Sequence, residues 1–168
     1  DSYWRRIPGM WVHGDWASRD ADGYWYVHGR SDDTIKVAGK RTGPAEIEAV
    51  LLATGRVSDA AAVALPEPVK GATVACVVVP APGEADDAGF RAALAAAVAA
   101  AMGSAFRPSL VLAVADLPKT RNMKTMRRVV RAALTGAPPG DLSALVNPET
   151  VAAIAAAFAL TRSAGPRS

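Results

Sequence analysis

The sequence predicts an α+β domain in which helices pack on a sheet of about three main strands, preceded by a separate β-hairpin. Two short apolar runs, 60–65 and 73–79, flank the turn-forming residues 66–71 and indicate paired strands. Apolar residues recur at helical spacing in 87–102 and in 124–134. In addition, all four tryptophans and all three tyrosines lie within the first 26 residues, and this shift in composition marks a boundary.

The aromatic opening segment predicts the hairpin. Residues 11–15 and 24–28 are interpreted as its two strands, joined through the turn-forming residues 20–23. An isolated hairpin is only marginally stable in water, so we expect this one to belong to a larger domain. The start of the chain has neither a methionine nor an apolar leader, which also indicates a piece of a longer protein.

The next unit is expected to open with a short strand at 34–37 and a loop at 39–43. Pro44 then occupies the favoured first position of a helix. Glu46 and Glu48 suit the positive end of that helix's dipole.

A further strand is expected at 109–114. The helix at 124–134 carries an apolar stripe on one side and basic residues on the others, so its basic side must face solvent or a ligand. After Gly136 a proline-rich break leads to an extended link. Asn147 is expected to cap a small final helix, with Pro148 in its first turn.

Composition restricts the class of protein. With 51% hydrophobic residues the chain can fill a core, and no apolar run approaches the roughly 20 residues that a membrane span needs. The single cysteine, Cys76, has no partner for a disulfide or a thiolate metal site, which favours a cytoplasmic protein. The two histidines, His13 and His28, lack metal-ligand spacing, so no metal site is expected.

Basic residues cluster in one part of the chain, although the formal net charge is only +3. No acidic residue interrupts the segment that contains Lys119, Arg121, Lys124, Arg127, Arg128 and Arg131. Such a run is compatible with an anionic partner, of which nucleotide phosphate is one candidate. Its basic residues are not interleaved with aromatic ones, which argues against a nucleic-acid surface.

Three segments, in this order and spacing, resemble signature motifs of the superfamily of acyl-CoA synthetases, luciferases and peptide-synthetase adenylation domains. They are Gly14-Asp15 followed by Asp22-Gly23-Tyr24, the run from Gly29 to Arg41, and Pro118-Lys119-Thr120-Arg121-Asn122-Met123-Lys124 with Met126-Arg127-Arg128. The tail is similar to the acetyl- and propionyl-CoA synthetase branch, through Gly140-Asp141-Leu142-Ser143 and Asn147-Pro148.

The resemblance implies the carboxy-terminal part of an AMP-forming acyl-CoA synthetase. In such an enzyme a carboxylate attacks the α-phosphate of ATP bound to Mg²⁺, pyrophosphate leaves, and the CoA thiol then displaces AMP. Residues 1–31 would end a large amino-terminal domain, 32–136 would form the small domain that acts as a lid, and 137–168 would be an extended tail with a short helix. The missing amino-terminal domain would bind ATP and a short-chain carboxylic acid, so the chain alone is expected to be inactive.

By the same resemblance, Asp15 and Arg30 bind the ribose of the nucleotide. A carboxylate suits this role because it can accept hydrogen bonds from two vicinal hydroxyls at once. Asp32 matches the hinge on which the small domain swings, although Asp32 and Asp33 also fit ordinary turn formers. From residue type alone, Asp15 would be interpreted as a turn aspartate that closes a strand.

Lys124 is the candidate catalytic residue. The matching lysine of the family neutralises charge that develops between the substrate carboxylate and the α-phosphate. Gly39 matches a loop that lines the pantetheine tunnel of CoA, and Arg41 would meet a phosphate. A solvated lysine, a turn glycine and a surface arginine are the alternatives from residue type alone. The resemblance also makes Lys124 a candidate target of a lysine acetyltransferase.

Four residues depart from the family pattern. Asn122 and Met123 stand where Ser-Gly is usual, and a methionine is strained in the left-handed backbone that glycine adopts freely. The loop before Lys124 is therefore expected to run differently. Ala38 and Ala99 replace a serine and an arginine of the acetyl-CoA synthetase branch, so the contacts with CoA are expected to be altered.

Two other functions remain open. An adenylation domain that passes its acyl group to a carrier-protein thiol shares these motifs, although the acetyl-type tail favours CoA. A small anion-binding or nucleic-acid-binding module would use the basic segment at 119–131. For the favoured ligase, neither a nucleic acid nor a membrane is expected as a partner.

Overall fold

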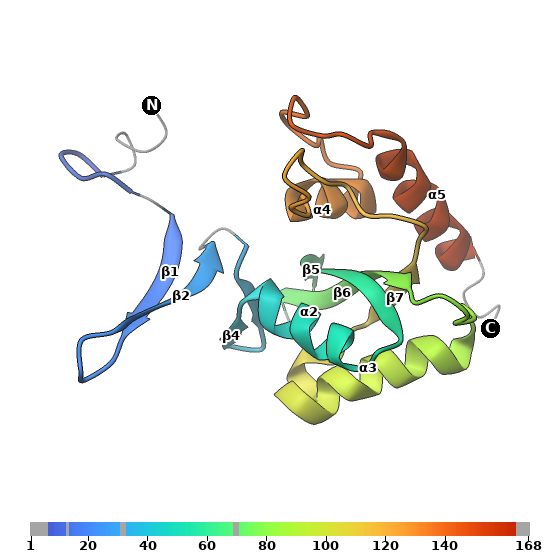
Figure 1. Ribbon diagram of the computed structural model, residues 1–168, viewed down its shortest axis with the longest axis horizontal. Coiled ribbons are helices and arrows are strands. Elements are labelled where there is room, and N and C mark those ends of the chain that lie inside the picture. The colour runs from blue at the N-terminus through green and yellow to red at the C-terminus, as the bar shows by residue number, and fades with distance from the viewer. Residues whose placement is uncertain (1–6, 13, 31–32, 69–70, 164–168) are drawn as a thin grey trace.

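The computed structural model describes residues 7–12, 14–30, 33–68 and 71–163 of the chain (Figure 1). Among these residues a three-stranded sheet forms the centre, with helices on both of its faces. A two-stranded hairpin from the start of the chain lies to one side. The predicted α+β fold, with helices packed on a sheet of three main strands, is confirmed.

The sheet consists of β5 (Val57–Glu67), β6 (Gly71–Pro80) and β7 (Leu110–Ala113), in the order β5-β6-β7. β5 and β6 pair antiparallel along their length, which confirms the predicted strand pair. β7 pairs parallel to β6. Parallel neighbours need a crossover connection, and here it consists of a helix followed by one 3-10 turn, η1 (Ser104–Phe106).

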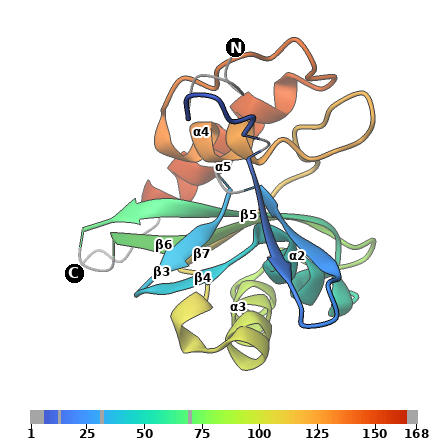
Figure 2. The same ribbon diagram turned by 90° about the vertical axis from the view of Figure 1, so that its left-hand side faces the viewer.

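The helices cover both faces of the sheet (Figure 2). Their bounds are α2 (Pro44–Ala53), α3 (Ala88–Met102), α4 (Arg127–Thr135) and α5 (Glu149–Ser163). Along β5, successive side chains alternate between two cores: Ala60 and Ala62 pack with α2 and α3, whereas Ala61 and Val63 pack with α4 and α5. Burial on both faces explains why these strands are almost continuously apolar.

Local signals in the sequence set the helix ends. Asp87 caps α3, because its carboxylate accepts a hydrogen bond of 2.7 Å from the Phe90 amide. α4 ends at Gly136, whose φ of 69° lies in the left-handed region. The other end of α4 differs from the prediction of a helix starting at 124. The helix begins at Arg127, and Lys124 lies in the loop before it.

The first hairpin pairs β1 (Asp15–Arg19) with β2 (Trp25–Arg30), with a bulge between the first two residues of β1 and the rest. The prediction of a first strand at 11–15 is therefore wrong, because β1 begins where that segment ends. The turn supplies the physical reason. Asp20 closes it by accepting a hydrogen bond from the Tyr24 amide, and a hairpin must pair the residues that directly flank its turn.

A second hairpin joins β3 (Ile35–Val37) to β4 (Lys40–Thr42). The segment 39–43, predicted to be a loop, thus contains a strand. The two residues that form the turn of this hairpin, Ala38 and Gly39, have φ values of 48° and 81°. Positive φ at both positions is the geometry that two-residue hairpin turns require, and it costs nothing at the glycine.

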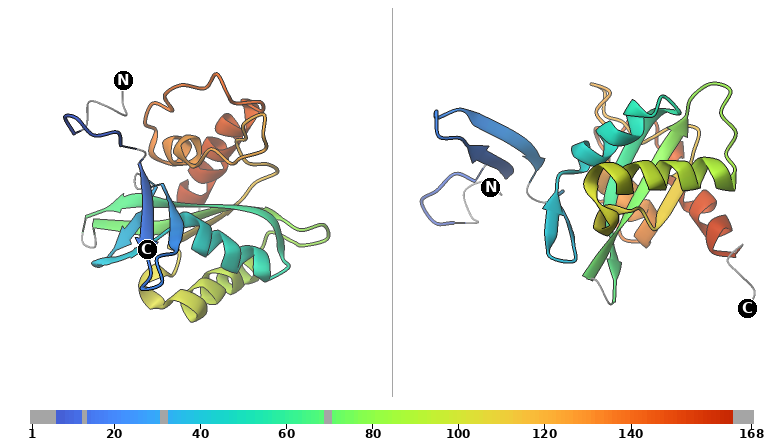
Figure 3. Two further views of the ribbon diagram at one scale, coloured as in Figure 1. Left: turned by 60° about the vertical axis from the view of Figure 1, so that its left-hand side comes forward. Right: turned by 90° about the horizontal axis from the view of Figure 1, so that it is seen from below.

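The first hairpin exposes large aromatic side chains, and Figure 3 shows it extending away from the sheet and its helices. Trp11, Tyr24 and Trp25 are 55%, 68% and 69% exposed. These residues contrast with the side chains of the two cores, many of which have no exposed surface. Several large apolar side chains exposed within one segment are typical of an interaction site in soluble proteins.

The final helix is longer than the small helix expected from the sequence. α5 runs for 15 residues, and Ile154 near its middle has no exposed surface. Ile154 packs with Leu112 of β7 and Leu134 of α4. The tail therefore contributes to the core that covers one face of the sheet.

Three observations bear on the class of protein. No helix in the described part of the chain is long and apolar enough to cross a membrane. Within the same residues, no group of three or more His, Cys, Asp or Glu side chains could hold a metal ion. Cys76 is buried in the sheet, and burial raises the pKa of its thiol, so the reactive thiolate is disfavoured.

The packing of α5 can be tested by truncating its buried side chain. Ile154→Ala is expected to lower the free energy of unfolding by about 2–5 kcal/mol, because it removes buried methyl groups and leaves a cavity. Leu160→Ala is the matched control on the same helix, since Leu160 is 70% exposed. Urea unfolding followed by circular dichroism measures both variants. Equal effects would contradict the packing of α5 described above.

Candidate functional site

The loop before α4 folds back on itself as a small hairpin, here called the Lys124 hairpin, in which 119–120 pairs with 124–125. Lys119 pairs with Thr125 in an antiparallel bridge, and the Thr120 amide donates to the Lys124 carbonyl over 3.0 Å. The Lys124 amide donates in return to the Thr120 hydroxyl over 3.2 Å. The side chain of Lys124 is exposed and makes no ion pair with any described residue.

An open groove runs beside this hairpin. It has a volume of about 550 Å³ and is lined by Thr120, Arg121, Asn122, Lys124, Ser143 and Ala144. The last two residues come from the link before α5, so the groove lies between the hairpin and the tail. A compact cation at such a groove can meet an anionic group that approaches from outside the domain.

Met123, beside Lys124, is 65% exposed and has a φ of 58°. The expectation that the loop would avoid the left-handed conformation here is therefore wrong. The hydrogen bond of 2.8 Å from the Met123 amide to the Thr120 carbonyl closes the turn and holds this conformation. A side chain in the left-handed region costs about 1–2 kcal/mol relative to glycine, so the turn carries strain next to the candidate catalytic lysine.

The positive charge of Lys119, at the base of the Lys124 hairpin, is neutralised by two carboxylates of the same domain. The Lys119 ammonium lies 3.0 Å from a carboxylate oxygen of Asp59 in β5 and 3.1 Å from one of Asp116. The hydrogen bond with Asp59, followed by that with Asp116, raises the pKa of Lys119 despite its partial burial. Lys119 is thus an anchor of the hairpin to the sheet, and it does not add to a basic surface for an anionic partner.

Arg127, the first residue of α4, is paired in the same way. Its guanidinium donates to both carboxylate oxygens of Glu48 in α2, over 2.7 and 2.6 Å, and lies 3.8 Å from Asp33. Hydrogen bonding to Glu48 raises the pKa of Arg127, which is charged throughout the accessible pH range. Glu48 also accepts a hydrogen bond of 3.0 Å from the Ala62 amide of β5.

The sequence did not predict that Glu48 pairs with Arg127. It assigned Glu48 only a favourable interaction with the helix dipole. A signal was present, because Glu48 falls on the buried stripe of α2 formed by Pro44, Ile47 and Leu51. A carboxylate on a buried stripe needs an opposite charge, and acidic residues are almost never fully buried without one.

A second pocket lies where α4 approaches the segment that follows the proposed hinge. It encloses about 240 Å³ and is lined in part by Asp33, Thr34, Pro44, Arg127 and Arg131. Arg128 lines it too, and its guanidinium donates to the Asp141 carbonyl over 2.6 Å. The basic side of α4 is therefore engaged largely within the domain.

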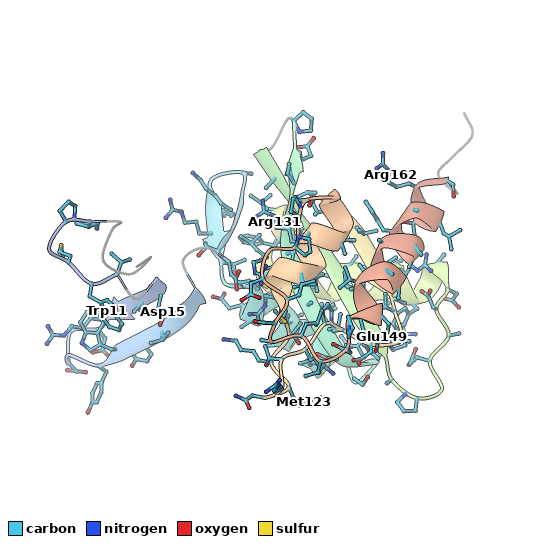
Figure 4. All side chains as sticks on the ribbon, turned by 90° about the horizontal axis from the view of Figure 1, so that it is seen from above. Trp11, Asp15, Met123, Arg131, Glu149 and Arg162 are labelled. Atoms are coloured by element: carbon cyan, nitrogen blue, oxygen red, sulfur yellow. The ribbon has the colours of Figure 1, made fainter. Side chains whose placement is uncertain are left out.

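The two residues assigned to the ribose are brought together. Asp15 at the start of β1 lies directly opposite Arg30 at the end of β2, and Asp15 is exposed. The side chain of Arg30 lies outside the described part of the structure, as does the whole of Asp32, the proposed hinge residue. Figure 4 shows Asp15 in the hairpin well apart from Met123 in the Lys124 loop.

Gly39 and Arg41 belong to a third location, the β3–β4 hairpin. Gly39 forms its tip, and a Cβ placed there would meet nothing within 4 Å, so its backbone is open to approach. Arg41 is exposed and lies opposite Lys36, which is exposed as well. The predicted site residues that the structure describes thus occupy three hairpins, with Asp15 and Arg30 on the first, Gly39 and Arg41 on β3–β4, and Lys124 on the hairpin before α4.

Comparison with known proteins gives this arrangement a family. Residues 46–124 match the model of the AMP-binding enzyme C-terminal domain. These residues form such a domain. Acetyl-coenzyme A synthetase of Methanothrix thermoacetophila is 41% identical over 149 residues, which cover 89% of this chain and 23% of that protein. The enzyme of the same name from Deinococcus radiodurans is 42% identical over 160 residues, which cover 95% of this chain and 24% of that protein.

Solved structures agree with this assignment. An acyl-CoA synthetase from Brucella canis has a TM-score of 0.60 and 33% identity, over 77% of this chain and 24% of that one. Acetoacetyl-CoA synthetase from Streptomyces lividans has a TM-score of 0.74 at 24% identity, over 98% of this chain and 24% of that one, and shows the fold alone. The chain spans about a quarter of the length of the relatives it matches. The resemblance to acetyl-CoA synthetases noted in the sequence is confirmed.

The buried ion pair can be tested by removing one partner. Arg127→Met is expected to lower the free energy of unfolding by about 3 kcal/mol, because it leaves the Glu48 carboxylate buried without a counter-charge. Arg131→Met on the same helix is the control and should change stability by less than about 0.5 kcal/mol. Denaturant unfolding measures both. If the double variant Glu48→Leu/Arg127→Met lost the sum of the two single effects, the pair would not be coupled.

The strain at Met123 can be tested by substitution at that position. Met123→Gly should leave stability unchanged or raise it by up to about 1 kcal/mol, since relief of the left-handed strain exceeds or offsets the added flexibility of the unfolded chain. Met123→Ala should match the parent protein, and β-branched Met123→Val should be less stable. Thermal unfolding measures all three, and a clear loss in Met123→Gly would contradict the positive φ.

Proposed function

We propose that this chain is the carboxy-terminal part of an AMP-forming acyl-CoA synthetase, which converts a carboxylate, ATP and CoA into acyl-CoA, AMP and pyrophosphate. The observation that carries this proposal is Lys124, whose ammonium makes no ion pair with any described residue and lies at an open groove, held there by a braced hairpin. The match to acetyl-coenzyme A synthetases supports it and favours a short-chain acid. Residues 1–31 end the large domain, 32–136 form the small domain, and 137–168 form its tail.

Lys124 acts in the first half-reaction. A carboxylate oxygen of the acid attacks the α-phosphorus of ATP, the bond to the bridging oxygen of pyrophosphate breaks, and acyl-AMP forms. The Lys124 ammonium stabilises the negative charge that builds up between carboxylate and phosphate, and its three donors can follow that charge without a fixed fork geometry. In the second half-reaction the CoA thiol loses its proton, its sulfur bonds to the acyl carbon, and AMP leaves.

The metal ion of this reaction would enter with ATP. Bound with ATP, Mg²⁺ would offset the negative charge of the phosphates and so favour the loss of pyrophosphate. The described residues of this chain do not include a carboxylate cluster that fits the ion. We therefore place the ligands of Mg²⁺ mainly on ATP and on the large domain.

Asp15 and Arg30 would hold the ribose at the edge of the large domain. Their opposed positions on β1 and β2 place the two residues at the same end of the hairpin, where one sugar would meet both. The exposed aromatic side chains of this opening segment, among them Trp11 and Trp25, would pack on the remainder of that domain. The amino-terminal part of the same protein is thus the proposed partner of the first hairpin.

The small domain would swing about Asp32 between the two half-reactions. Lys124 must be near the phosphate in the first and away from it in the second, and a hinge of a few residues can supply that change. Gly39 and Arg41 lie on a different hairpin and would take the place of Lys124, with the open Gly39 backbone beside the pantetheine of CoA and Arg41 at a phosphate.

Two further proposals concern the cell. We infer a cytoplasmic location from the single buried cysteine, which needs no oxidising compartment. Exposure of Lys124 makes it accessible to a lysine acetyltransferase, and acetylation would remove the charge on which adenylation depends. In contrast, a nucleic-acid-binding module loses support, because Lys119 and Arg127 are paired with acidic residues of the same domain.

Removal of the ammonium tests the proposal in the full-length ligase. Lys124→Ala should lower acid-dependent ATP–pyrophosphate exchange by at least about 10²–10³-fold, the cost of removing one stabilising donor from a transition state. It should spare thioester formation from supplied acyl-AMP, since Lys124 has no part in that step. Arg107→Ala, on an exposed loop before β7, is the control.

Equal loss of both half-reactions in Lys124→Ala would assign the lysine to structure and overturn its proposed role. A panel of short and medium carboxylic acids in the same exchange assay identifies the acid. Parallel measurement of CoA-dependent AMP release identifies the acceptor, and exchange without CoA-dependent turnover would instead favour a carrier-protein thiol.

A further inference from the structure

The side chain of Asn147 lies at the junction between the tail and the segment that leads to Lys124. Its amide oxygen accepts a hydrogen bond of 2.9 Å from the Lys119 amide. Its amide nitrogen donates to the Leu117 carbonyl and to the Asp116 carboxylate, over 2.8 Å in each case. One side chain thus bonds to three of the four residues in the distant segment 116–119.

This arrangement differs from the helix cap that the sequence predicted for Asn147. At the start of α5, the Asn147 backbone carbonyl accepts hydrogen bonds from the amide and the hydroxyl of Thr150. The Asn147 side chain therefore does not cap the helix and instead bonds to the segment 116–119. Thr150 is almost fully buried, so the start of α5 is itself held in the core.

Asn147 extends a contact that joins the tail to the Lys124 hairpin. Thr120 forms an antiparallel bridge with Leu145, and the Val146 amide donates to the Lys119 carbonyl over 3.0 Å. Lys119 and Thr120 are also the residues that pair with the arm containing Lys124. The segment 119–120 thus lies between two segments that it bridges, the tail on one side and the Lys124 arm on the other.

We propose that Asn147 is a positioning residue for the adenylation step, which holds the Lys124 hairpin in register against the tail. The inference rests on the proposed function, in which the Lys124 ammonium meets the reacting carboxylate and phosphate. Asn147 itself would touch no substrate. It acts through the backbone of Lys119, one strand away from the backbone of Lys124.

The chemistry of the amide explains why an asparagine suits this position. Its oxygen accepts while its nitrogen donates twice, and both capacities are used. An aspartate would keep the acceptor but lose both donors, and its charge would face Asp116 at hydrogen-bond distance. Burial opposes ionisation of Asp116, but hydrogen bonds from the Leu117 amide, Lys119 and Asn147 outweigh it, so the pKa of Asp116 lies below its ordinary value.

Positioning matters for this lysine because its loop lies in solvent and carries strain at Met123. A displacement of about 1 Å in a catalytic group can cost about 10²-fold in rate, so a loop that slips against the tail loses adenylation first. Thioester formation does not use the Lys124 ammonium and is insensitive to that displacement.

The test compares Asn147→Asp with Glu149→Gln in the full-length ligase. Glu149 is exposed at the first turn of α5, two residues from Asn147. Glu149→Gln also interconverts a carboxylate and an amide, but away from the contact with segment 116–119. Asn147→Asp should lower ATP–pyrophosphate exchange by about 10- to 100-fold, while thioester formation from supplied acyl-AMP stays within about twofold of the parent. Glu149→Gln should change neither. Retained thioester formation also shows that the variant is folded.

A second variant and a second measurement complete the test. In Asp116→Asn/Asn147→Asp the amide and the carboxylate exchange places, which removes the repulsion and should restore at least part of the exchange activity. Hydrogen exchange should show faster exchange of the Thr120 and Lys124 amides in Asn147→Asp and not in Glu149→Gln.

Equal loss of both half-reactions, or no loss of pyrophosphate exchange, would overturn the positioning role. Unchanged protection of the Thr120 and Lys124 amides would overturn it too. These outcomes are distinct from failure of the proposed function, which Lys124→Ala reports. If Lys124→Ala spared pyrophosphate exchange, the lysine assignment would fall whatever Asn147→Asp does, whereas hydrogen exchange would still measure whether Asn147 holds the hairpin.

Discussion

The buried ion pair between Glu48 and Arg127 is the interaction on which the rest of the domain depends. β5 is an edge strand, and Glu48 accepts a hydrogen bond from its Ala62 amide while it pairs with the first residue of α4. A single carboxylate therefore joins α2 on one face of the sheet, the edge of the sheet, and α4 on the other face. The Lys124 loop ends at Arg127, so its position is fixed by the same pair that closes the edge.

Three contacts brace the Lys124 hairpin from different directions. Arg127 holds its end to α2, Lys119 holds its base to Asp59 of β5, and Asn147 joins it to the tail. Each bracing residue is polar and partly buried, and each is satisfied by a partner distant in the sequence. The exposed lysine and the strained Met123 can persist between these anchors because the surrounding structure over-determines the turn.

The sequence predicted the elements whose signals are local. The apolar runs of β5 and β6, the helical spacing of 87–102 and the break after Gly136 at the end of α4 all lie within the segments that they define. It could not predict interactions between distant segments. Asp59, one of the two acidic partners of Lys119, lies about 60 residues away, and both acidic partners of Arg127 lie about 80 to 95 residues away. The residues that bond to the Asn147 side chain lie about 30 residues away. The family motifs identified Lys124, but nothing local revealed what holds it.

The uneven distribution of aromatic residues has a spectroscopic consequence. All four tryptophans of this chain precede β3, and the sheet with its covering helices contains none. Intrinsic tryptophan emission therefore reports the environment of the first hairpin and is nearly blind to unfolding of the three-stranded sheet. Trp11 and Trp25 are more than half exposed, so burial of these rings against another surface would shift that emission to shorter wavelength. The tryptophan emission of this chain would therefore report the docking of another surface on this hairpin.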